Sequence, residues 1–255
     1  MKKYSVLLAG LLIFISCNQT PKSNQFKVEG FLSNGQNRTL VLNEISPEGN
    51  IFIDTIRIDE NGEFEYTYTM PYPSFYTLQT DKGEFITLIP DYREVIGIEG
   101  DYDTLSPSYV VKGSMHSQLL WALNDKELEG IAILNDIYKT WDEFAYHEES
   151  VEIKKQLDSL YYETWHDQKA FYYNFILDNK GSLATLMALY KTFNKRTVFP
   201  VEANADLYDT VNAGLSQRLP DNPHTKHFLR SYRRKTVSSE NTEQSSQSET
   251  DGRQE

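Results

Sequence analysis

The chain has 255 residues, with 37 acidic and 25 basic side chains and a formal net charge of −12 at pH 7. Because phosphate binding depends on clustered Lys and Arg, this balance argues against a nucleic acid or another polyanion as partner. A single cysteine, Cys17, excludes an internal disulfide, a thiol redox pair and a cysteine-ligated metal.

The first residues have the layout of a secretory signal peptide. Two lysines open the chain, an apolar run follows through Ile15, and Ser16 precedes Cys17. The apolar run is shorter than the ~20 residues that a membrane-spanning helix needs. We therefore predict a signal peptide at residues 1–16.

The residues around the expected cleavage site also carry a lipidation signal. Phe14-Ile15-Ser16-Cys17 resembles the lipobox of bacterial lipoproteins, with Phe14 in place of the usual Leu. The resemblance implies acylation of Cys17, and two or more acyl chains anchor a protein stably. The alternative is an ordinary signal peptide that precedes a cysteine by chance. We expect a lipidated tether at residues 17–24. No acidic cluster follows the cysteine, so we place the anchor in the outer membrane, facing the periplasm.

Residues 25–113 alternate between apolar and polar side chains, the pattern of half-buried strands. Asn61-Gly62 predicts a hairpin turn, because Gly adopts a positive φ without strain. About eight short antiparallel strands predict a β-sandwich or partial barrel in an α+β chain. The expected strands are Phe26–Leu32, Thr39–Ile45, Ile51–Ile58, Phe64–Met70, Ser74–Thr80, Phe85–Pro90, Glu94–Gly100 and Tyr109–Lys112.

After Gly113 the apolar period changes to 3.6, which predicts a mostly helical half at residues 114–235, packed on the sheet. The last residues, 236–255, are polar apart from one valine, which predicts a disordered tail or a tail that folds on a partner. The expected helices run from Ser114 to about Lys126, across Ile131–Trp141, across Ile153–Ile176, from Ser182, across Ala203–Leu219, and from Asn222-Pro223.

Several motifs together resemble the domain of unknown function 4369. They include Phe26-Lys27-Val28-Glu29-Gly30, Asp54-Thr55-Ile56-Arg57-Ile58-Asp59 and Val110-Val111-Lys112-Gly113-Ser114. The resemblance covers about residues 26–234 and implies a lipoprotein β domain followed by a helical segment. In many members a thioredoxin-like oxidoreductase domain comes next. This chain has no Cys-x-x-Cys, so the resemblance implies the non-catalytic front part alone.

Carboxylates gather at the end of one expected strand. Asp101 and Asp103 follow Glu99, and such a cluster binds Ca²⁺, acts as an acid–base pair, or simply lies in a solvated turn. The chain contains no Gly-rich phosphate loop, nucleophile elbow or zincin motif.

Other residues have the spacing of metal or ligand contacts. The pairs Glu143/His147, Asp142/Tyr146 and His224/His227 are three or four residues apart, which places two metal ligands, or an ordinary surface pair, on one helical face. Five aromatic residues lie near Pro71 and Pro73 and are suited either to stacking on a ligand or to packing in the core. These aromatic residues are Tyr66, Tyr68, Tyr72, Phe75 and Tyr76.

A tripeptide of Asp, a hydroxyl residue and an aliphatic residue occurs four times. It resembles the O-glycosylation signal of some lipoprotein-rich Gram-negative bacteria. The hypothesis is that at least one site is glycosylated, with candidates Thr55, Thr104, Ser159 and Thr210.

These patterns lead to three functional hypotheses. The first is a non-enzymatic envelope lipoprotein that binds or scaffolds a partner, with no catalytic residue, cofactor or metal. The second is an accessory subunit that docks a separately encoded thioredoxin-like oxidoreductase. The third, a hydrolase, would use carboxylates such as Asp101 and Asp103. The expected partners are a membrane, through the lipid, and an envelope protein.

Overall fold

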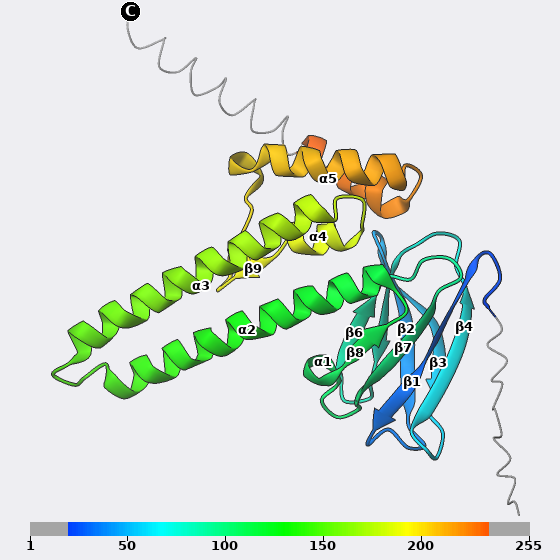
Figure 1. The fold of residues 1–255 in the computed structure, drawn as a ribbon, viewed down its shortest axis with the longest axis horizontal. Helices are drawn as coiled ribbons and strands as arrows, with labels where there is room; N and C mark the ends of the chain where they lie inside the picture. The colour runs from blue at the N-terminus through cyan, green and yellow to red at the C-terminus, as the bar shows by residue number, and fades with distance from the viewer. Residues whose placement is uncertain (1–19, 235–255) are drawn as a thin grey trace, which may run out of the picture.

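The computed structural model describes residues 20–234. Cys17, the expected signal peptide and the expected tail at 236–255 lie outside this range. A β-sandwich comes first along the chain and a helical half follows (Figure 1). The α+β class is therefore confirmed. Within residues 20–234, no helix combines the length and the apolar character needed to cross a membrane.

The β half consists of two four-stranded sheets that face each other. Their strand orders are β4-β1-β7-β8 and β3-β2-β5-β6, so neither sheet closes into a barrel. All eight expected strands are present: β1 (Gln25–Ser33), β2 (Thr39–Ser46), β3 (Gly49–Arg57), β4 (Glu63–Thr69), β5 (Phe75–Gln79), β6 (Phe85–Leu88), β7 (Val95–Asp101) and β8 (Val110–Lys112).

One strand pair departs from the antiparallel arrangement that the sequence predicts. β1 and β7 run parallel, with Val28 opposite Ile96 and Gly30 opposite Ile98. The other pairs between these eight strands are antiparallel. An alternating pattern shows which face of a strand is buried but not the direction of its neighbour.

The prediction of a hairpin at Asn61-Gly62 is also wrong, although the predicted turn is present. Gly62 has a φ of +88°, and the turn closes through a bond from the Gly62 amide to the Asp59 carbonyl. The two flanking strands do not pair. β3 pairs with β2, and β4 pairs with β1. The turn therefore carries the chain from one sheet to the other.

The interior of the sandwich follows from the strand period. Alternate residues of both sheets are fully buried, including Phe26 and Val28 on β1 and Leu40 and Leu42 on β2. Burying a side chain of this size contributes about 1.5–3 kcal/mol. The same alternation directs Glu44, the next inward position of β2, to this interior.

The helical half packs a second apolar core against one end of the sandwich. Its last segment, residues 223–234, is helical. A short helix, α1 (Leu105–Ser108), precedes β8 in the β half. The other elements of the helical half are α2 (Met115–Phe144), α3 (Ser150–Asp178), α4 (Ala184–Leu189), β9 (Thr192–Phe193), β10 (Arg196–Thr197), the 3₁₀ turn η1 (Val201–Ala203) and α5 (Ala205–Arg218).

The predicted boundary between the first two helices is wrong, because α2 is one helix of 30 residues. Ser114 caps it as expected, with its hydroxyl accepting the Ser117 amide. Gly130 lies inside the helix, where a Cβ would come 2.7 Å from the amide nitrogen of Gln168 on α3. Gly therefore serves close helix packing at this position and does not end the helix.

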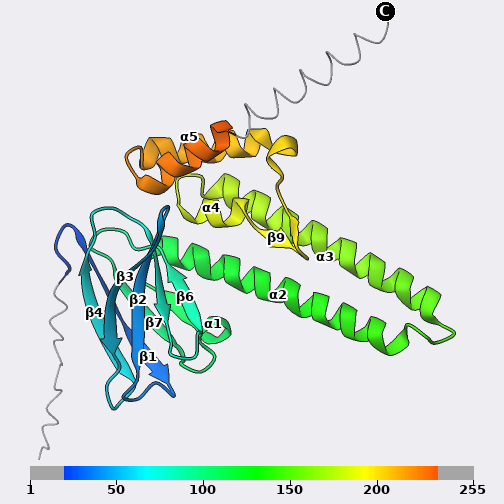
Figure 2. The same cartoon turned by 180° about the vertical axis from the view of Figure 1, so that it is seen from behind.

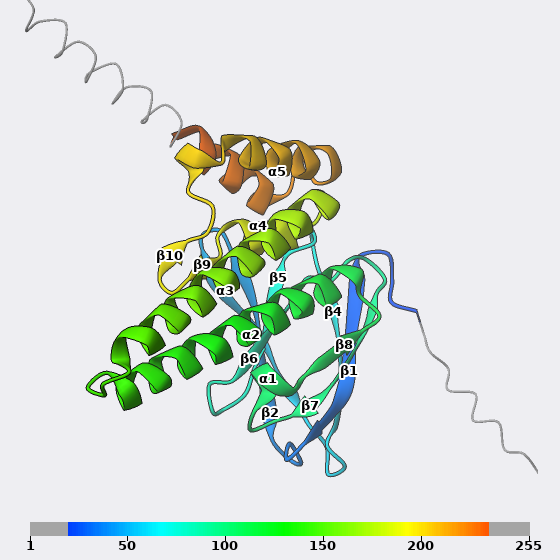
Figure 3. The same ribbon diagram turned by 60° about the vertical axis from the view of Figure 1, so that its left-hand side comes forward.

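α2 and α3 form an antiparallel hairpin whose far end projects away from the sandwich (Figures 1 and 2). α4 and α5 lie at the near end, close to the sandwich, as the turned view also shows (Figure 3). The far half of α3 has no fully buried residue, and Val151 and Tyr162 there are largely exposed.

Candidate binding groove

A groove of about 500 Å³ lies where the sandwich meets the helical half. Residues 71–73 from the β4–β5 loop and residues 91–92 from the β6–β7 loop form one side. Residues 218–222, from the end of α5 to the start of the last helix, form the other side. We call this feature the junction groove. Prolines in two of these loops fix φ, so the loops are restrained even though they are partly exposed.

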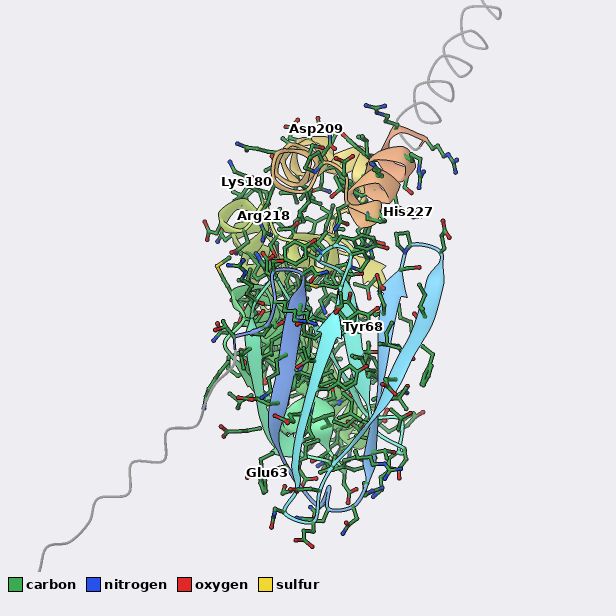
Figure 4. The ribbon with its side chains drawn as sticks, turned by 90° about the vertical axis from the view of Figure 1, so that its right-hand side faces the viewer. Glu63, Tyr68, Lys180, Asp209, Arg218 and His227 are labelled. Atoms are coloured by element: carbon green, nitrogen blue, oxygen red, sulfur yellow. The ribbon has the colours of Figure 1, made fainter. Side chains whose placement is uncertain are left out.

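An ion pair and a phenol hold the groove in shape. Arg218 donates to Asp91 over 2.5 Å and to the Gly181 carbonyl over 3.1 Å. Tyr92 donates to the Pro71 carbonyl over 2.9 Å. The groove therefore presents a paired Arg and Asp beside tyrosine and proline surfaces. Figure 4 shows Arg218 at the end of the helical half that faces the sandwich.

Beneath the groove, a buried polar cluster joins the two halves. Ser74 Oγ and His224 Nε2 lie 3.0 Å apart, and Asn222 donates to the Pro73 carbonyl over 2.7 Å. The His224 ring packs edge-on against Phe75, with centroids 4.9 Å apart. Burial, followed by the charge of His227, lowers the pKa of His224 to about 4.

The Ser74–His224 pair has the atoms of a nucleophile and its general base, but a substrate cannot reach the serine hydroxyl. Ser74 is 0% exposed, so no substrate reaches its hydroxyl in this conformation. The pair therefore serves to join the two halves. Asn222 caps the last helix as predicted, because its side-chain oxygen accepts the His224 amide.

A second buried histidine lies on the other side of the junction. His116 Nε2 is 3.9 Å from Asp91, and its Nδ1 has no hydrogen-bond partner within residues 20–234. Burial is the main cause that lowers the pKa of His116, and the nearby Arg218 adds to it. This ring is therefore neutral at pH 7 and belongs to the packing of the α2 N-terminus.

Of the aromatic residues singled out in the sequence, Tyr68 lies on β4 towards the end of the sandwich that faces the helical half (Figure 4). The rings of Phe26, Tyr68 and Tyr76 contact one another, with centroids 5.2–6.0 Å apart. Phe75 and Tyr76 are buried, whereas Tyr72 is half-buried and lines the junction groove. Tyr66 and Tyr68 pack against the sandwich core, so packing accounts for four of the five aromatic residues but not for Tyr72.

Tyr66 has a different role from the rest of the aromatic group. Its hydroxyl donates to Asp54 over 2.9 Å, a contact between β4 and β3. Burial is the first cause, and Asp54 the second, that raises the pKa of Tyr66 to about 12. Tyr66 thus ties the neighbouring edges of the two sheets together.

The carboxylates proposed as an acid–base pair are used to build a turn. Asp101 accepts from Ser33 over 3.0 Å and from Asn34 over 2.6 Å. Asp103 accepts from Arg38 and Lys82, each over 2.8 Å. Hydrogen bonding, chiefly from the Asp103 amide, lowers the pKa of Asp101. The Lys82 ammonium lowers that of Asp103. Neither group is suited to act as a general acid near neutral pH.

The histidine pairs are not brought together as metal ligands. α2 ends at Phe144, so Glu143 is in the helix and His147 is in the turn that follows. The two side chains therefore do not share one helical face. Tyr146 is 99% exposed, while His224 is buried and His227 exposed. Across residues 20–234, no three His, Cys, Asp or Glu side chains gather closely enough to hold a metal ion.

A larger depression, of about 720 Å³, lies on the outer face of the first sheet above Glu29, Gly97 and Glu99. Charged side chains on this face pair with one another. Lys27 bridges Glu29 and Glu65 at 2.8 and 2.7 Å. We take the junction groove as the candidate site because Asn222 and Pro73, which line it, belong to the buried polar cluster that joins the two halves.

The four candidate glycosylation residues differ in accessibility. Thr55 on β3 and Thr104 before α1 are exposed, and so is Ser159 on α3, which donates to Glu163 over 3.0 Å. Thr210 is half-buried in α5 and donates to the Asp206 carbonyl over 2.8 Å. Thr55 and Thr104 are therefore the positions most open to an added sugar.

One feature of this region had a signal in the sequence that the pattern analysis missed. Glu44 continues the alternation of Leu40 and Leu42, so a carboxylate stands on an otherwise apolar face. Pro71 and Pro73, which the sequence analysis had noted beside the aromatic group, restrain the loop directly before β5. The Ser74–His224 contact had no such signal, because it joins residues that are 150 positions apart.

The comparisons with known proteins give one family match, which covers the β half of the chain. Residues 26–120 match the family model described as a domain of unknown function (DUF4369). The resemblance is thereby confirmed over the sandwich and the first turns of α2. No curated protein matches the chain. An NMR structure of a protein from Eubacterium rectale is 12% identical in sequence, with a TM-score of 0.21. The match covers 35% of this chain and 87% of the other chain.

Proposed function

We propose that this chain, whose residues 26–120 match domain of unknown function 4369, is a non-enzymatic envelope lipoprotein that binds a partner protein through the junction groove. The observation that carries the proposal is the composition of the groove. Tyrosine and proline surfaces from three segments line a restrained, open channel beside one ion pair.

The proposed occupant is an extended segment of an envelope protein. Grooves lined by aromatic side chains bind extended, often proline-containing peptides, because such ligands lose little conformational entropy on binding. Tyr92 is 40% exposed at the rim and the Pro71 carbonyl orients its hydroxyl. A bound segment would therefore meet a rigid aromatic surface, which favours binding.

The state of the carboxylates supports a non-enzymatic role. Asp101 and Asp103, which a hydrolase of the third hypothesis would use, are held by hydrogen bonds and ion pairs within a turn. A catalytic pair requires two groups whose environments move their pKa values apart. Both of these pKa values move down.

Site-specific crosslinking in living cells tests the groove. A photoreactive phenylalanine derivative in place of Tyr92 is expected to form a discrete adduct with an envelope protein. The same group in place of Tyr162, which is 61% exposed on α3, serves as the control and is expected to form none. The measurement is the shift of the tagged protein on a denaturing gel after irradiation.

The identity of the adduct decides between two forms of the proposal. A thioredoxin-like oxidoreductase in the Tyr92 adduct would make the chain a docking subunit for that enzyme. A different envelope protein would make it a scaffold for other partners. Equal adducts at both positions, or none at Tyr92, would contradict binding in the groove.

The proposal also includes acylation of Cys17, an outer-membrane anchor facing the periplasm, and glycosylation of an exposed Asp-Thr site. Cys17 itself lies outside the described residues. The intact mass of the native protein is expected to equal the peptide from Cys17 onward plus acyl chains and at least one sugar. Cys17→Ala is expected to abolish the acyl mass and release the chain from the membrane fraction. A native mass without acyl or sugar excess would refute the corresponding modification.

A further inference from the structure

The interior of the sandwich contains one carboxylate that no described residue neutralises. Glu44 is 4% exposed, and its Oε1 has no hydrogen-bond partner within residues 20–234. No ion pair of this part of the chain includes it. Burying a charge in this way costs several kcal/mol unless a cation or hydrogen bonds offset the cost.

Tyrosines surround this carboxylate. Tyr76 lies directly opposite Glu44 in the β2–β5 register, and its hydroxyl is likewise buried without a partner in the described range. Tyr68 packs on Tyr76 with ring centroids 5.8 Å apart. Tyr72 follows on the proline-flanked loop. Two unsatisfied buried polar atoms thus face one small region at the end of the sandwich.

The electrostatics agree with this arrangement. Burial is the first cause that raises the pKa values of Tyr68, Tyr72 and Tyr76, and the charge of Glu44 is the second cause for all three. Glu44 therefore acts on three phenols at once. A positive charge placed among them would pair with the carboxylate without competing with any cation of residues 20–234.

The composition of the cluster favours an organic cation over a metal ion. Divalent metals require several charged or imidazole ligands, whereas this cluster has a single carboxylate. Aromatic faces attract ammonium groups by cation–π interaction, most strongly where water is excluded. Tyr68 and Tyr72 are both half-buried, and Tyr72 also lines the junction groove.

We propose that Glu44, Tyr68, Tyr72 and Tyr76 form a binding site for a primary ammonium group, such as a lysine side chain presented by a segment bound in the junction groove. The carboxylate pairs with the ammonium while the rings enclose its alkyl stem. This inference rests on the proposed function, because the lysine belongs to the partner. The negative net charge of the chain favours a partner segment of this kind.

Butylammonium chloride is the probe for this site. Titration calorimetry on the full chain is expected to detect binding that sodium chloride, potassium chloride and 1-butanol at equal concentrations do not reproduce. Glu44→Gln is expected to weaken this binding by about tenfold or more, because it removes a desolvated ion pair. The matched control is Glu48→Gln, a nearby exposed carboxylate, and it is expected to change the affinity by less than about twofold.

A second variant is needed in case Glu44→Gln does not fold. Tyr72 is half-buried on a loop, outside both cores, so Tyr72→Ala is expected to leave the chain folded and to weaken butylammonium binding by about fivefold. Tyr72→Phe is expected to keep the cation–π face and most of the affinity. Equal binding of potassium would refute the ammonium assignment. So would unchanged affinity in both Glu44→Gln and Tyr72→Ala, or no binding to the unaltered chain.

The two proposals fail in different ways. A Tyr92 crosslink without butylammonium binding would leave the partner groove standing and refute the lysine site. Butylammonium binding that depends on Glu44, without any Tyr92 adduct, would support the ammonium site and refute the docking of a partner protein.

Discussion

Lowering the pH from about 7 to about 4 is expected to destabilise the protein by up to about 3 kcal/mol through His224 alone. Burial lowers the pKa of this ring from 6.5 to about 4 in the folded state. The unfolded chain therefore holds more protons than the folded chain between these values. The stabilisation is complete above pH 6.5 and is lost as the pH falls towards about 4.

The physical cause of this loss is the junction between the two halves. A protonated His224 would place a charge among Ser74, Phe75 and the backbone of the last helix, where no described carboxylate contacts it. His116 changes stability in the same direction, because burial lowers its pKa as well. The carboxylates with lowered pKa values, such as Asp101, reduce the free energy of unfolding only when the pH falls below about 3.8, their ordinary pKa.

Urea unfolding at a series of pH values measures the effect. His224→Gln keeps a hydrogen-bonding group near Ser74 and does not titrate, so the slope of stability between pH 6.5 and pH 4 is expected to decrease. The matched control is His166→Gln, at an exposed position on α3, and it is expected to leave the slope unchanged. Equal slopes in the unaltered chain and His224→Gln would contradict the assignment to His224.

The sequence predicted the elements of this fold better than their connections. Alternation located all eight strands of the sandwich, because burial of one face imposes a period of two on each strand separately. It did not reveal that β1 and β7 run parallel or that Gly62 turns the chain between sheets. Pairing depends on contacts between residues that are distant along the chain, which no local period records.

The helices show the same limit in another form. The prediction from the sequence divided α2 between Lys126 and Ile131, but Gly130 lies inside the helix, where Gln168 of α3 comes close to it. The candidate site was only partly predictable. Tyr72 and Tyr76 were recognised as members of an aromatic group, but their carboxylate, Glu44, was not. Its significance depends on burial, which becomes clear only when the opposite sheet is in place.

The parallel contact between β1 and β7 is expected to be very sensitive to one methyl group. A Cβ added to Gly30 would lie 2.0 Å from the Ile98 carbonyl oxygen and 2.9 Å from its carbon. Neither atom can move without disrupting the ladder that joins the two strands. Gly30→Ala is therefore expected to cost about 3 kcal/mol or more, at the upper end of the range for overpacking in a core.

Gly97 provides the matched control for this prediction, because it lies on β7 next to Ile98. A Cβ at Gly97 would come no closer than 4.0 Å to another side chain, that of Lys112. Gly97→Ala is expected to change stability by less than about 1 kcal/mol, with a gain expected from the lower backbone entropy of the unfolded chain. The measurement is the free energy of unfolding in urea. Equal losses in Gly30→Ala and Gly97→Ala would contradict the close approach of β1 and β7, because only Gly30 faces a backbone carbonyl.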